Sequence, residues 1–393
     1  DQTVLATLKP QLPAFADLDR WQNELNQYRS DQIPRVMIMS DANPRQTHVL
    51  SRGEYLKPMD VVQFDTPKSL PPLPAEFPRN RLGFARWLFL PEHPLTARVQ
   101  VNRLWQQFFG DGLVVTPEDF GVQSEYPLHK ELLDWLAVEY RESGWRTKAL
   151  VRLMVTSSTY RQASVVTAEA WERDPRNAFL TRARRLRLPS LVLRDWALAT
   201  AGLLDSRIGG VPVYPYQPDG VWESLAITKE RDFTYPKSSG ADLYRRSLYT
   251  FWRRTVGPSN MFDAANRQTC RVRASITSTP LHALTMLNDP TWVEAARMLA
   301  QRTLREQPAD LPEQLKLVFR RVLCREATDG ELERLTAAFH KQRAHYQTHS
   351  AAAQEWLSVG QAPPDTELDP ITLAALGNVC LAILNLDEAM TRQ

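Results

Sequence analysis

The sequence has few cysteines and no motif that would use them. Cys270, Cys324 and Cys380 are the only cysteines among the 393 residues, and they lie far apart. No CxxC or CxxCH spacing occurs, which excludes a zinc ribbon and a covalent haem site within this chain. An odd number of widely spaced cysteines also provides no disulfide framework.

Motifs of several common enzyme and membrane classes are absent too. The sequence contains no Gly-rich phosphate loop and no HExxH, GxSxG or SxxK motif. Its seven histidines do not cluster with carboxylates or cysteines at metal-ligand spacing. No apolar run reaches the length of a membrane-spanning helix. The sequence therefore predicts neither a metal site nor a membrane span.

The charge of the chain is nearly balanced. Lys and Arg total 48, Asp and Glu total 45, and the net charge is +3. Because binding to a phosphate backbone needs a strongly basic face, we expect no nucleic-acid partner. The basic residues comprise 39 arginines and 9 lysines. Arginine is the better residue for bidentate contacts with carboxylate or phosphate groups, although a GC-rich genome also explains the excess.

The first residues of the sequence resemble an internal segment of a longer protein. The chain opens with DQTVLATLKPQLPAF and has no initiator methionine. We expect it to be the C-terminal part of a longer precursor, so that any targeting signal would lie upstream.

Hydrophobic spacing predicts a mainly α fold with a small β element near residues 35–66. Helical spacing runs through residues 12–30, whereas RVMIM (35–39) and THVLSRGEYLKPMDVVQFD (47–65) are typical of strands or a hairpin. A proline-rich stretch follows, and amphipathic helices continue to the end. One of them follows Asn288–Asp289–Pro290, which is typical of an N-cap with proline at the first helical position. We expect the helical end of an upstream domain at 1–34, a hairpin and linker at 35–78, and a helical domain at 79–393.

A first group of candidate site residues is Asn102, Arg103 and Asp119. The stretch VNRLWQQFFGDGLVVTPEDFG places the first two on a helix and the third on the loop after it. One interpretation is a buried clamp in which Asp119 pairs with Arg98 or Arg103 and holds the loop. The other interpretation is a ligand-binding site.

A second group lies in FDAANRQTCRVRASITSTPLHAL (262–284), which is unusually dense in polar residues. Arg271 and Arg273 would share one face if extended. With Asp263 and Thr277 they could seat an anion or a sugar at the N-terminus of the next helix. The alternative is a buried structural junction in which Thr279 caps that helix and at least one arginine meets a carboxylate.

Trp222 is the surface candidate among eleven tryptophans. It lies in the irregular segment 211–240, which is rich in proline and aromatic residues. Exposed aromatic rings next to polar groups are suited to holding sugars, whereas tryptophans on apolar helix stripes are typical of a core. Long irregular segments are often functional.

Long stretches of the chain resemble the planctomycete-specific PSD-one domain, domain of unknown function family 1553. The resemblance is carried by NRLGFARWLFLPEHPLTARVQVNRLWQQFFGDGLVVTPEDFGVQSEYPLHKELLDWLA, by RRSLYTFWRRTVGPSNMFDAANRQTCRVRASITSTPLHALTMLNDP, by FRRVLCREATDGELERL and by the final NLDE. It spans roughly residues 35–390. One departure is visible, since TSTPLHAL stands where relatives tend to have TNTPLQAL, with Ser278 and His282 at the changed positions.

The resemblance implies a cellular context rather than a chemistry. Such domains usually end larger extracytoplasmic proteins that carry a cytochrome c module upstream and that are linked to polysaccharide use. This implies an extracytoplasmic location, haem only on an upstream segment or partner, and a sulfated or other polysaccharide as ligand. Two hypotheses follow. The chain is a docking or scaffold module, or it is a carbohydrate-active or redox enzyme domain with a cleft lined by Asp and Arg.

Overall fold

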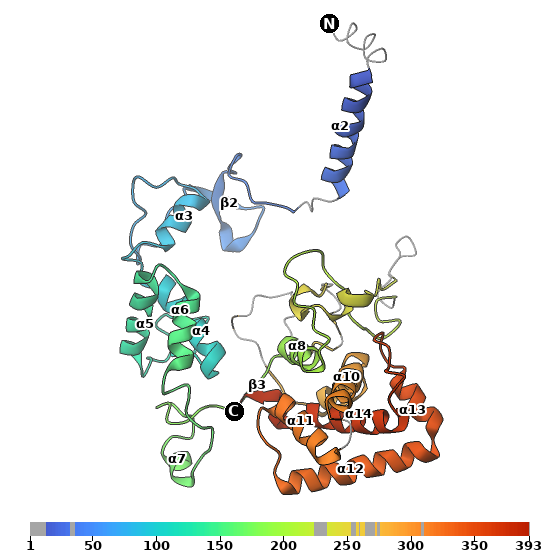
Figure 1. Ribbon diagram of the computed structural model, residues 1–393. Coiled ribbons are helices and arrows are strands. Elements are labelled where there is room, and N and C mark those ends of the chain that lie inside the picture. The colour runs from blue at the N-terminus through green and yellow to red at the C-terminus, as the bar shows by residue number, and fades with distance from the viewer. Residues whose placement is uncertain are drawn as a thin grey trace. The chain divides into compact units, whose positions relative to one another are not determined.

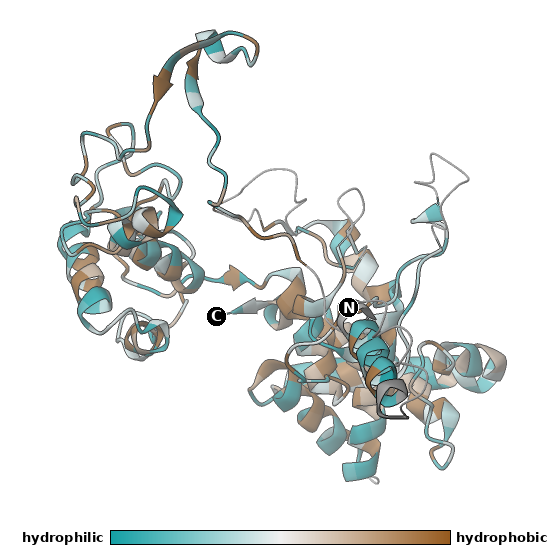
Figure 2. Cartoon of the chain, turned by 90° about the horizontal axis from the view of Figure 1, so that it is seen from above, coloured by the Kyte–Doolittle hydropathy of each residue, from teal (hydrophilic) through white to brown (hydrophobic). Residues whose placement is uncertain are grey.

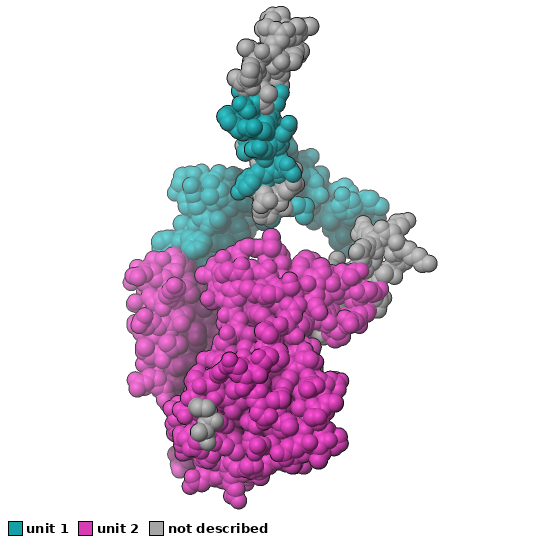
Figure 3. Space-filling model, turned by 45° about the vertical axis from the view of Figure 1, so that its right-hand side comes forward, with its two compact units in different colours: residues 1–96 teal, residues 97–393 magenta. Residues whose placement is uncertain are grey.

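The computed structural model describes residues 13–31, 36–223, 234–252, 257–258, 260–263, 272, 276–307 and 310–392. The chain forms two compact units, residues 1–96 and residues 97–393, which Figure 3 distinguishes by colour. Helices dominate the described residues, and the strands form two small antiparallel sheets. This confirms the predicted mainly α fold class.

The predicted β element is a hairpin in the N-terminal unit. β1 (Thr47–Leu50) pairs antiparallel with β2 (Pro58–Val62), and the register places His48 opposite Val61. Residues 36–39, which the apolar stretch suggested as another strand, form none. Their side chains are exposed, and a strand needs a paired neighbour to satisfy its backbone groups.

Two helices accompany this hairpin in the described part of the N-terminal unit. α2 (Pro13–Asp31) is hydrophilic along most of its length (Figure 2). α3 (Arg81–Leu88) begins where the side chain of Asn80 accepts a hydrogen bond from the Gly83 amide at 3.1 Å. The buried Trp87 of α3 donates its indole N–H to the Pro71 carbonyl at 2.7 Å, so the proline-rich segment packs against this helix.

The C-terminal unit contains two hydrophobic cores. The first is built from α4 (Thr96–Phe109), α5 (Lys130–Glu142) and α6 (Thr147–Thr156), followed by the short α7 (Ala168–Arg173). Trp105 and Phe109 stack with ring centroids 3.8 Å apart. Apolar side chains spaced three or four positions apart on α5 and α6 close over these rings, namely Leu133, Leu136, Leu150 and Met154.

The second core is centred on two helices that pack against each other (Figure 1). These are α10 (Pro290–Glu306) and α14 (Pro370–Leu384), and α14 is buried along most of its length. The surrounding helices are α8 (Ser190–Ala201), α9 (Pro280–Asn288), α11 (Leu311–Leu323), α12 (Asp329–Thr348), α13 (Ser350–Leu357) and α15 (Asp387–Met390). Within the described residues, no helix combines the length and apolarity needed to cross a membrane.

Local capping chemistry fixes where several of these helices begin. Thr279 caps α9 and Asp289 caps α10, each followed by a proline at the first helical position, as the sequence predicts. Thr328 and Glu331 form a reciprocal capping box at the start of α12. These starts place Asp289 at the end of α10 that forms the cleft described below.

The last two family-like stretches of the sequence meet in space. Arg325, from FRRVLCREATDGELERL, donates to Glu331 at 2.7 Å and to Glu388 of the final NLDE at 2.6 Å. The guanidinium of Arg325 lowers the pKa of Glu331 from its ordinary 4.5 to about 2. Beyond NLDE, β4 (Thr391–Arg392) pairs antiparallel with β3 (Leu186–Arg187), a second small sheet that the sequence did not indicate.

Arg325→Gln should lower the free energy of unfolding by roughly 1–2 kcal/mol at pH 7, because hydrogen bonds to charged groups contribute more than neutral ones but these side chains are partly exposed. A carboxyl group whose pKa is lower in the folded state stabilises the fold above its unfolded pKa and loses that contribution in acid. The difference between variant and wild type should therefore shrink as the pH falls from about 4.5 towards 2. Urea unfolding at a series of pH values measures it.

The matched control is Arg320→Gln. Arg320 is also an arginine near the end of α11, but it pairs at 3.0 Å with the exposed Glu326. Its loss should change the free energy of unfolding by less than about 0.5 kcal/mol, as is usual for surface positions. A pH-independent deficit in the Arg325 variant would contradict the assigned role of the two carboxylates.

Candidate functional site

A cleft of about 840 Å³ opens in the C-terminal unit at the N-terminal end of α10. Its walls come from residues 216–223 and 234–237, from the junction of α9 and α10, and from the loop 359–361 after α13. The described lining is rich in aromatic, carboxyl and amide groups, with one lysine: Tyr216, Tyr235, Asp219, Glu223, Asp289, Gln217, Asn288, Gln361 and Lys237. This composition is typical of a site that recognises a polar ligand.

A buried carboxyl group on α10 supports one wall. Glu294 has no exposed surface, and it accepts hydrogen bonds from the Tyr216 hydroxyl at 3.1 Å, the Tyr244 hydroxyl at 2.8 Å and the Ala362 amide at 2.6 Å. Arg297, also buried, lies 3.8 Å away. Burial and the neighbouring Glu294 raise the pKa of both tyrosines, so their hydroxyls remain donors.

The loop at 359–361 is shaped to fit over this carboxyl group. Gly360 has φ +93°, and a β-carbon there would lie 2.3 Å from the carboxyl carbon of Glu294. The next amide, that of Gln361, donates to the Tyr216 hydroxyl at 2.8 Å. Only glycine combines this backbone conformation with so close an approach. The wall formed by Tyr216 and Gln361 is therefore fixed by hydrogen bonds to buried groups.

Asp289 is a buried carboxyl group of the cleft, and its surroundings shift its pKa. It is 9% exposed, and its Oδ1 accepts the Thr291 amide at 2.9 Å as the cap of α10. Burial raises the pKa of this carboxyl, with the hydrogen bonds from Thr291 and Asn260 acting in the opposite direction. Asp219 and Glu223 of the same cleft are exposed. The cleft thus combines a carboxyl group that favours protonation with carboxyl groups open to solvent.

Trp222 lies beside the cleft in an aromatic cluster. Its ring contacts Tyr235 edge-on at 5.0 Å and Tyr214 at 6.1 Å, and Tyr214 stacks on Phe251 at 5.1 Å. Tyr235 also donates its hydroxyl to the Pro215 carbonyl at 2.6 Å. In this arrangement Tyr235 lines the cleft, and Trp222, which is also half-buried, packs against it; the role predicted for Trp222 stays a prediction.

Asn102 holds the loop after α4. One interpretation of the sequence was that an arginine–aspartate pair would hold this loop. Asn102 is completely buried on α4, and its amide bonds both backbone groups of Val114. Nδ2 donates to the Val114 carbonyl at 3.0 Å, and Oδ1 accepts the Val114 N–H at 2.9 Å. An amide can do this because it offers a donor and an acceptor in one plane.

The predicted pairing of Asp119 with an arginine is wrong. The side chain of Asp119 accepts the Gly121 amide at 2.7 Å and so closes a turn within its own loop. Arg98 pairs instead with Asp134 on α5, at 2.6 Å. Arg103 is exposed on α4. The physical reason is orientation, because α4 turns Asn102, and not an arginine, towards the loop.

Asp263 and Thr277 are hydrogen-bonded to each other within the polar string 262–284. The Asp263 carboxylate accepts the Thr277 amide at 2.6 Å and its hydroxyl at 2.9 Å. Thr277 is exposed and Asp263 half-buried, so this part of the junction lies at the surface and not in the interior. Arg271 and Arg273 lie outside the described residues, and their predicted carboxylate contact stays a prediction.

The two positions that depart from the family pattern have protein contacts. The Ser278 hydroxyl accepts a hydrogen bond from Arg187 at 3.2 Å. The His282 ring stacks on Phe262, with ring centroids 3.9 Å apart. Ser278 therefore joins the string 262–284 to Arg187 of β3, and His282 joins the two ends of the string to each other.

Sequence reasoning missed several residues of the cleft. Tyr216 and Tyr235 lie in the segment 211–240, whose aromatic content was the available signal. Asp289 was identified as a helix cap but not as a cleft residue. Glu294 had no signal, because a single glutamate in an amphipathic helix is indistinguishable from a solvated one. Among the described residues no three His, Cys, Asp or Glu side chains gather as metal ligands.

Asn102→Ala should destabilise the protein by roughly 2–4 kcal/mol, because it removes two hydrogen bonds and leaves two buried backbone groups of Val114 unpaired. Arg103→Ala, at the adjacent exposed position, should change stability by less than about 0.5 kcal/mol. Thermal unfolding followed by circular dichroism compares the two variants. Equal melting temperatures for both variants would show that the amide does not hold the loop.

Comparison with known proteins yields one match. The family model described as "PSD1: Protein of unknown function (DUF1553)" matches residues 80–339. Neither a curated protein nor a solved structure matches the chain. The matched range begins at the cap of α3, ends within α12, and includes most of the cleft at the start of α10. Because it covers well over half of the sequence, the chain belongs to the PSD1 (DUF1553) family of proteins of unknown function.

Proposed function

We propose that this protein is an extracytoplasmic saccharide-binding module that holds polysaccharide for a partner, and that the cleft at the start of α10 is its sugar site. The observation that carries the proposal is the lining of this cleft, where tyrosine rings stand beside carboxyl and amide groups. Sugars present apolar C–H faces and hydroxyl edges, so they need both kinds of group. A volume of about 840 Å³ lies within the range of ligand pockets.

The rigidity of the wall supports the same proposal. Tyr216 is fixed by its bonds to Glu294 and Gln361, and Tyr235 by its bond to the Pro215 carbonyl. Lys237 lies over the Tyr216 ring, 5.9 Å from its centroid. A site that is ordered before the ligand arrives loses less conformational entropy on binding. Preorganisation matters for a sugar because its hydroxyl groups lose hydrogen bonds to water when it binds.

In this proposal the module works beside other proteins. The family resemblance supports a location outside the cytoplasm, next to a c-type cytochrome segment or partner that would carry haem. The module would dock this partner and present a polysaccharide, sulfated or neutral, to an enzyme of the same assembly. Purification of the protein from its native source, with haem absorbance measured at each step, would test this arrangement independently of sugar binding.

A second candidate function is favoured by one observation. Burial raises the pKa of Asp289 in the cleft that also contains the exposed Glu223. A buried carboxyl group with a raised pKa, beside a solvent-exposed carboxyl group, resembles the pair that glycoside hydrolysis uses as acid and base or nucleophile. In that case Asp289 would act as the general acid. Its role as the cap of α10 makes a purely structural function the competing explanation.

The sugar site is tested by calorimetric titration of the full chain with a panel of neutral and acidic oligosaccharides. We expect wild type to bind at least one. Replacing both exposed carboxylates, Asp219→Asn with Glu223→Gln, should weaken binding about tenfold or more, because a hydrogen bond to a charged group contributes ~1.5–3 kcal/mol. Tyr235→Phe should retain most of the affinity because it keeps the ring.

The control is Glu118→Gln, which removes an exposed carboxylate outside the cleft. It should bind like wild type. Absence of binding across the panel, or equal affinity in the double variant, would reject the sugar site. Release of reducing ends by wild type, lost in Asp289→Asn, would replace the binding function with the hydrolytic one.

A further inference from the structure

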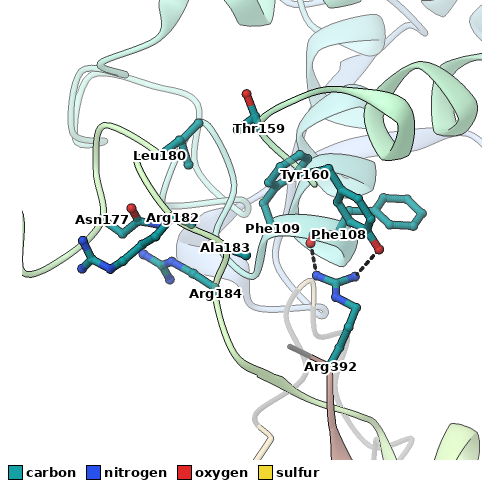
Figure 4. Close-up of a pocket in the computed structure, with 10 residues that line it drawn as sticks. All are labelled: Phe108, Phe109, Thr159, Tyr160, Asn177, Leu180, Arg182, Ala183, Arg184 and Arg392. Carbon is teal, nitrogen blue, oxygen red and sulfur yellow. Dashed lines mark hydrogen bonds between the residues drawn. The ribbon is translucent and has the colours of Figure 1, made fainter. Parts of the chain in front are cut away.

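A second cleft, of about 1000 Å³, lies against the first core of the C-terminal unit. A side chamber of about 130 Å³ adjoins it and shares Arg182 and Arg184 with it. In Figure 4 the segment that carries Asn177, Arg182 and Arg184 forms one side of this chamber, and the aromatic side chains of Phe108 and Tyr160 form the other. None of these residues belongs to the cleft at α10.

The loop that carries the arginines is held in one conformation by its own buried side chains. Asp174 is 7% exposed, and its two oxygens accept the amides of Ala178 at 2.7 Å and Phe179 at 2.8 Å. Asn177, with φ +52°, donates its side-chain amide to the Arg182 carbonyl at 2.8 Å. A loop so fully bonded presents its charged groups at fixed positions.

Arg182 is the central side chain of this loop. It is 9% exposed, and its Nη2 donates to the carbonyls of Asp174 at 2.8 Å and Pro175 at 3.2 Å. Its Nη1 is buried and has no hydrogen-bond partner in the described structure. Guanidinium donors that are removed from water are normally paired. The side chain therefore has an unused donor group, and no carboxylate among the described residues forms an ion pair with it.

Positive charge exceeds negative charge on the described wall of this cleft. Arg176 is exposed and makes no ion pair with a described residue. Arg184 pairs with Asp111, and Arg185 pairs with an aspartate of α15. Glu125 is the remaining acidic group of the wall. Neither Arg176 nor Arg182 thus forms an ion pair with a described carboxylate beside this cavity, although the buried Asp174 carboxylate and Arg182 attract each other electrostatically.

We propose that this cleft binds the tetrahedral oxyanion of a sulfate or phosphate ester carried on a larger polar ligand. Arg182 is the buried anchor, and a small outward turn of its planar guanidinium presents Nη1 to the ester oxygens. Arg176 supplies a second contact from the rim. Arginine suits this task because its fork of donors matches two oxygens of the same group and stays charged at every relevant pH.

The volumes of the chamber and the cleft fit a ligand whose ester group enters the chamber while the remainder lies in the larger cleft. A chamber of about 130 Å³ is close to the ~150 Å³ that encloses a benzene molecule, so it accommodates one small group and not a chain. The larger cleft has room for the remainder of the ligand beside Tyr126 and His129. His129 already contacts the Ala178 carbonyl at 2.9 Å, which joins this wall to the arginine loop.

The test is calorimetric titration of the full chain with three ligands at one ionic strength: a sulfated oligosaccharide, its desulfated counterpart and a sugar phosphate. Because the α10 cleft can take the sugar part of either oligosaccharide, we expect at least one of the two esters to bind wild type more tightly than the desulfated sugar does, with an additional binding event that the desulfated sugar lacks. Arg176→Ala should weaken ester binding about tenfold, the loss expected for one charge-assisted hydrogen bond. Arg182→Gln should abolish it. Which ester binds identifies the source of the oxyanion.

The matched control is Arg173→Ala, which removes an exposed arginine on α7, three positions from Arg176 and outside the cleft. It should bind the ester like wild type. Equal losses of ester affinity in Arg176→Ala and Arg173→Ala would show that only the overall charge matters, and would overturn the site. Equal affinity of wild type for the sulfated and the desulfated sugar would also overturn it. If the Arg182→Gln variant does not fold, the ester affinities of Arg176→Ala and Arg173→Ala still test the site.

This site is independent of the sugar cleft at α10, and one variant separates the two. The double change Asp219→Asn with Glu223→Gln alters the α10 cleft alone. It should leave binding of the ester at the arginine cleft unchanged. Loss of ester binding in this variant would place the oxyanion in the α10 cleft and contradict the assignment to Arg182.

Discussion

Much of the C-terminal unit is organised around the carboxyl group of Glu294, which is completely buried near the start of α10. Removing a carboxyl group from water is strongly unfavourable unless hydrogen bonds replace the lost hydration. Two tyrosines and a backbone amide supply those bonds, and Gly360 leaves the space they need. The segments that carry these groups are thereby drawn over α10, and they become the walls of the cleft.

Arginine performs the corresponding task for the irregular segments. Arg194, 1% exposed on α8, donates to the carbonyls of Leu243 and Arg245, both at 2.9 Å, and so holds the end of a short 3-10 helix (Gly240–Tyr244) against α8. Arg245 in turn donates to the Arg207 carbonyl. A planar fork of five donors can satisfy several carbonyl groups at once in a fixed geometry, whereas lysine offers three donors on a single nitrogen. The high ratio of arginine to lysine therefore has a structural use here, whatever its genomic origin.

The same chemistry separates structural arginines from those available to a ligand. Arg297 and Arg325 have carboxylate partners, and their role is to join helices and loops. Arg176 and Arg182 stand beside a cavity without such a partner in the described structure. The α10 cleft shows the complementary pattern, with exposed carboxyl groups and aromatic rings around a preorganised wall. The two sites thus suit different parts of a ligand, hydroxyl-rich in one case and anionic in the other.

Local patterns in the sequence determined the helical class, the hairpin near residues 35–66 and the caps at Thr279 and Asp289, because these depend on neighbours within a few positions. Contacts between distant residues were decided only by the tertiary structure. Tyr216 and Glu294 are 78 positions apart, and no local pattern pairs them. On α4, spacing alone could not show that Asn102 faces the loop and Arg103 faces solvent. Capping is a property of one turn of chain, whereas the satisfaction of a buried polar group depends on which segments the hydrophobic cores bring together.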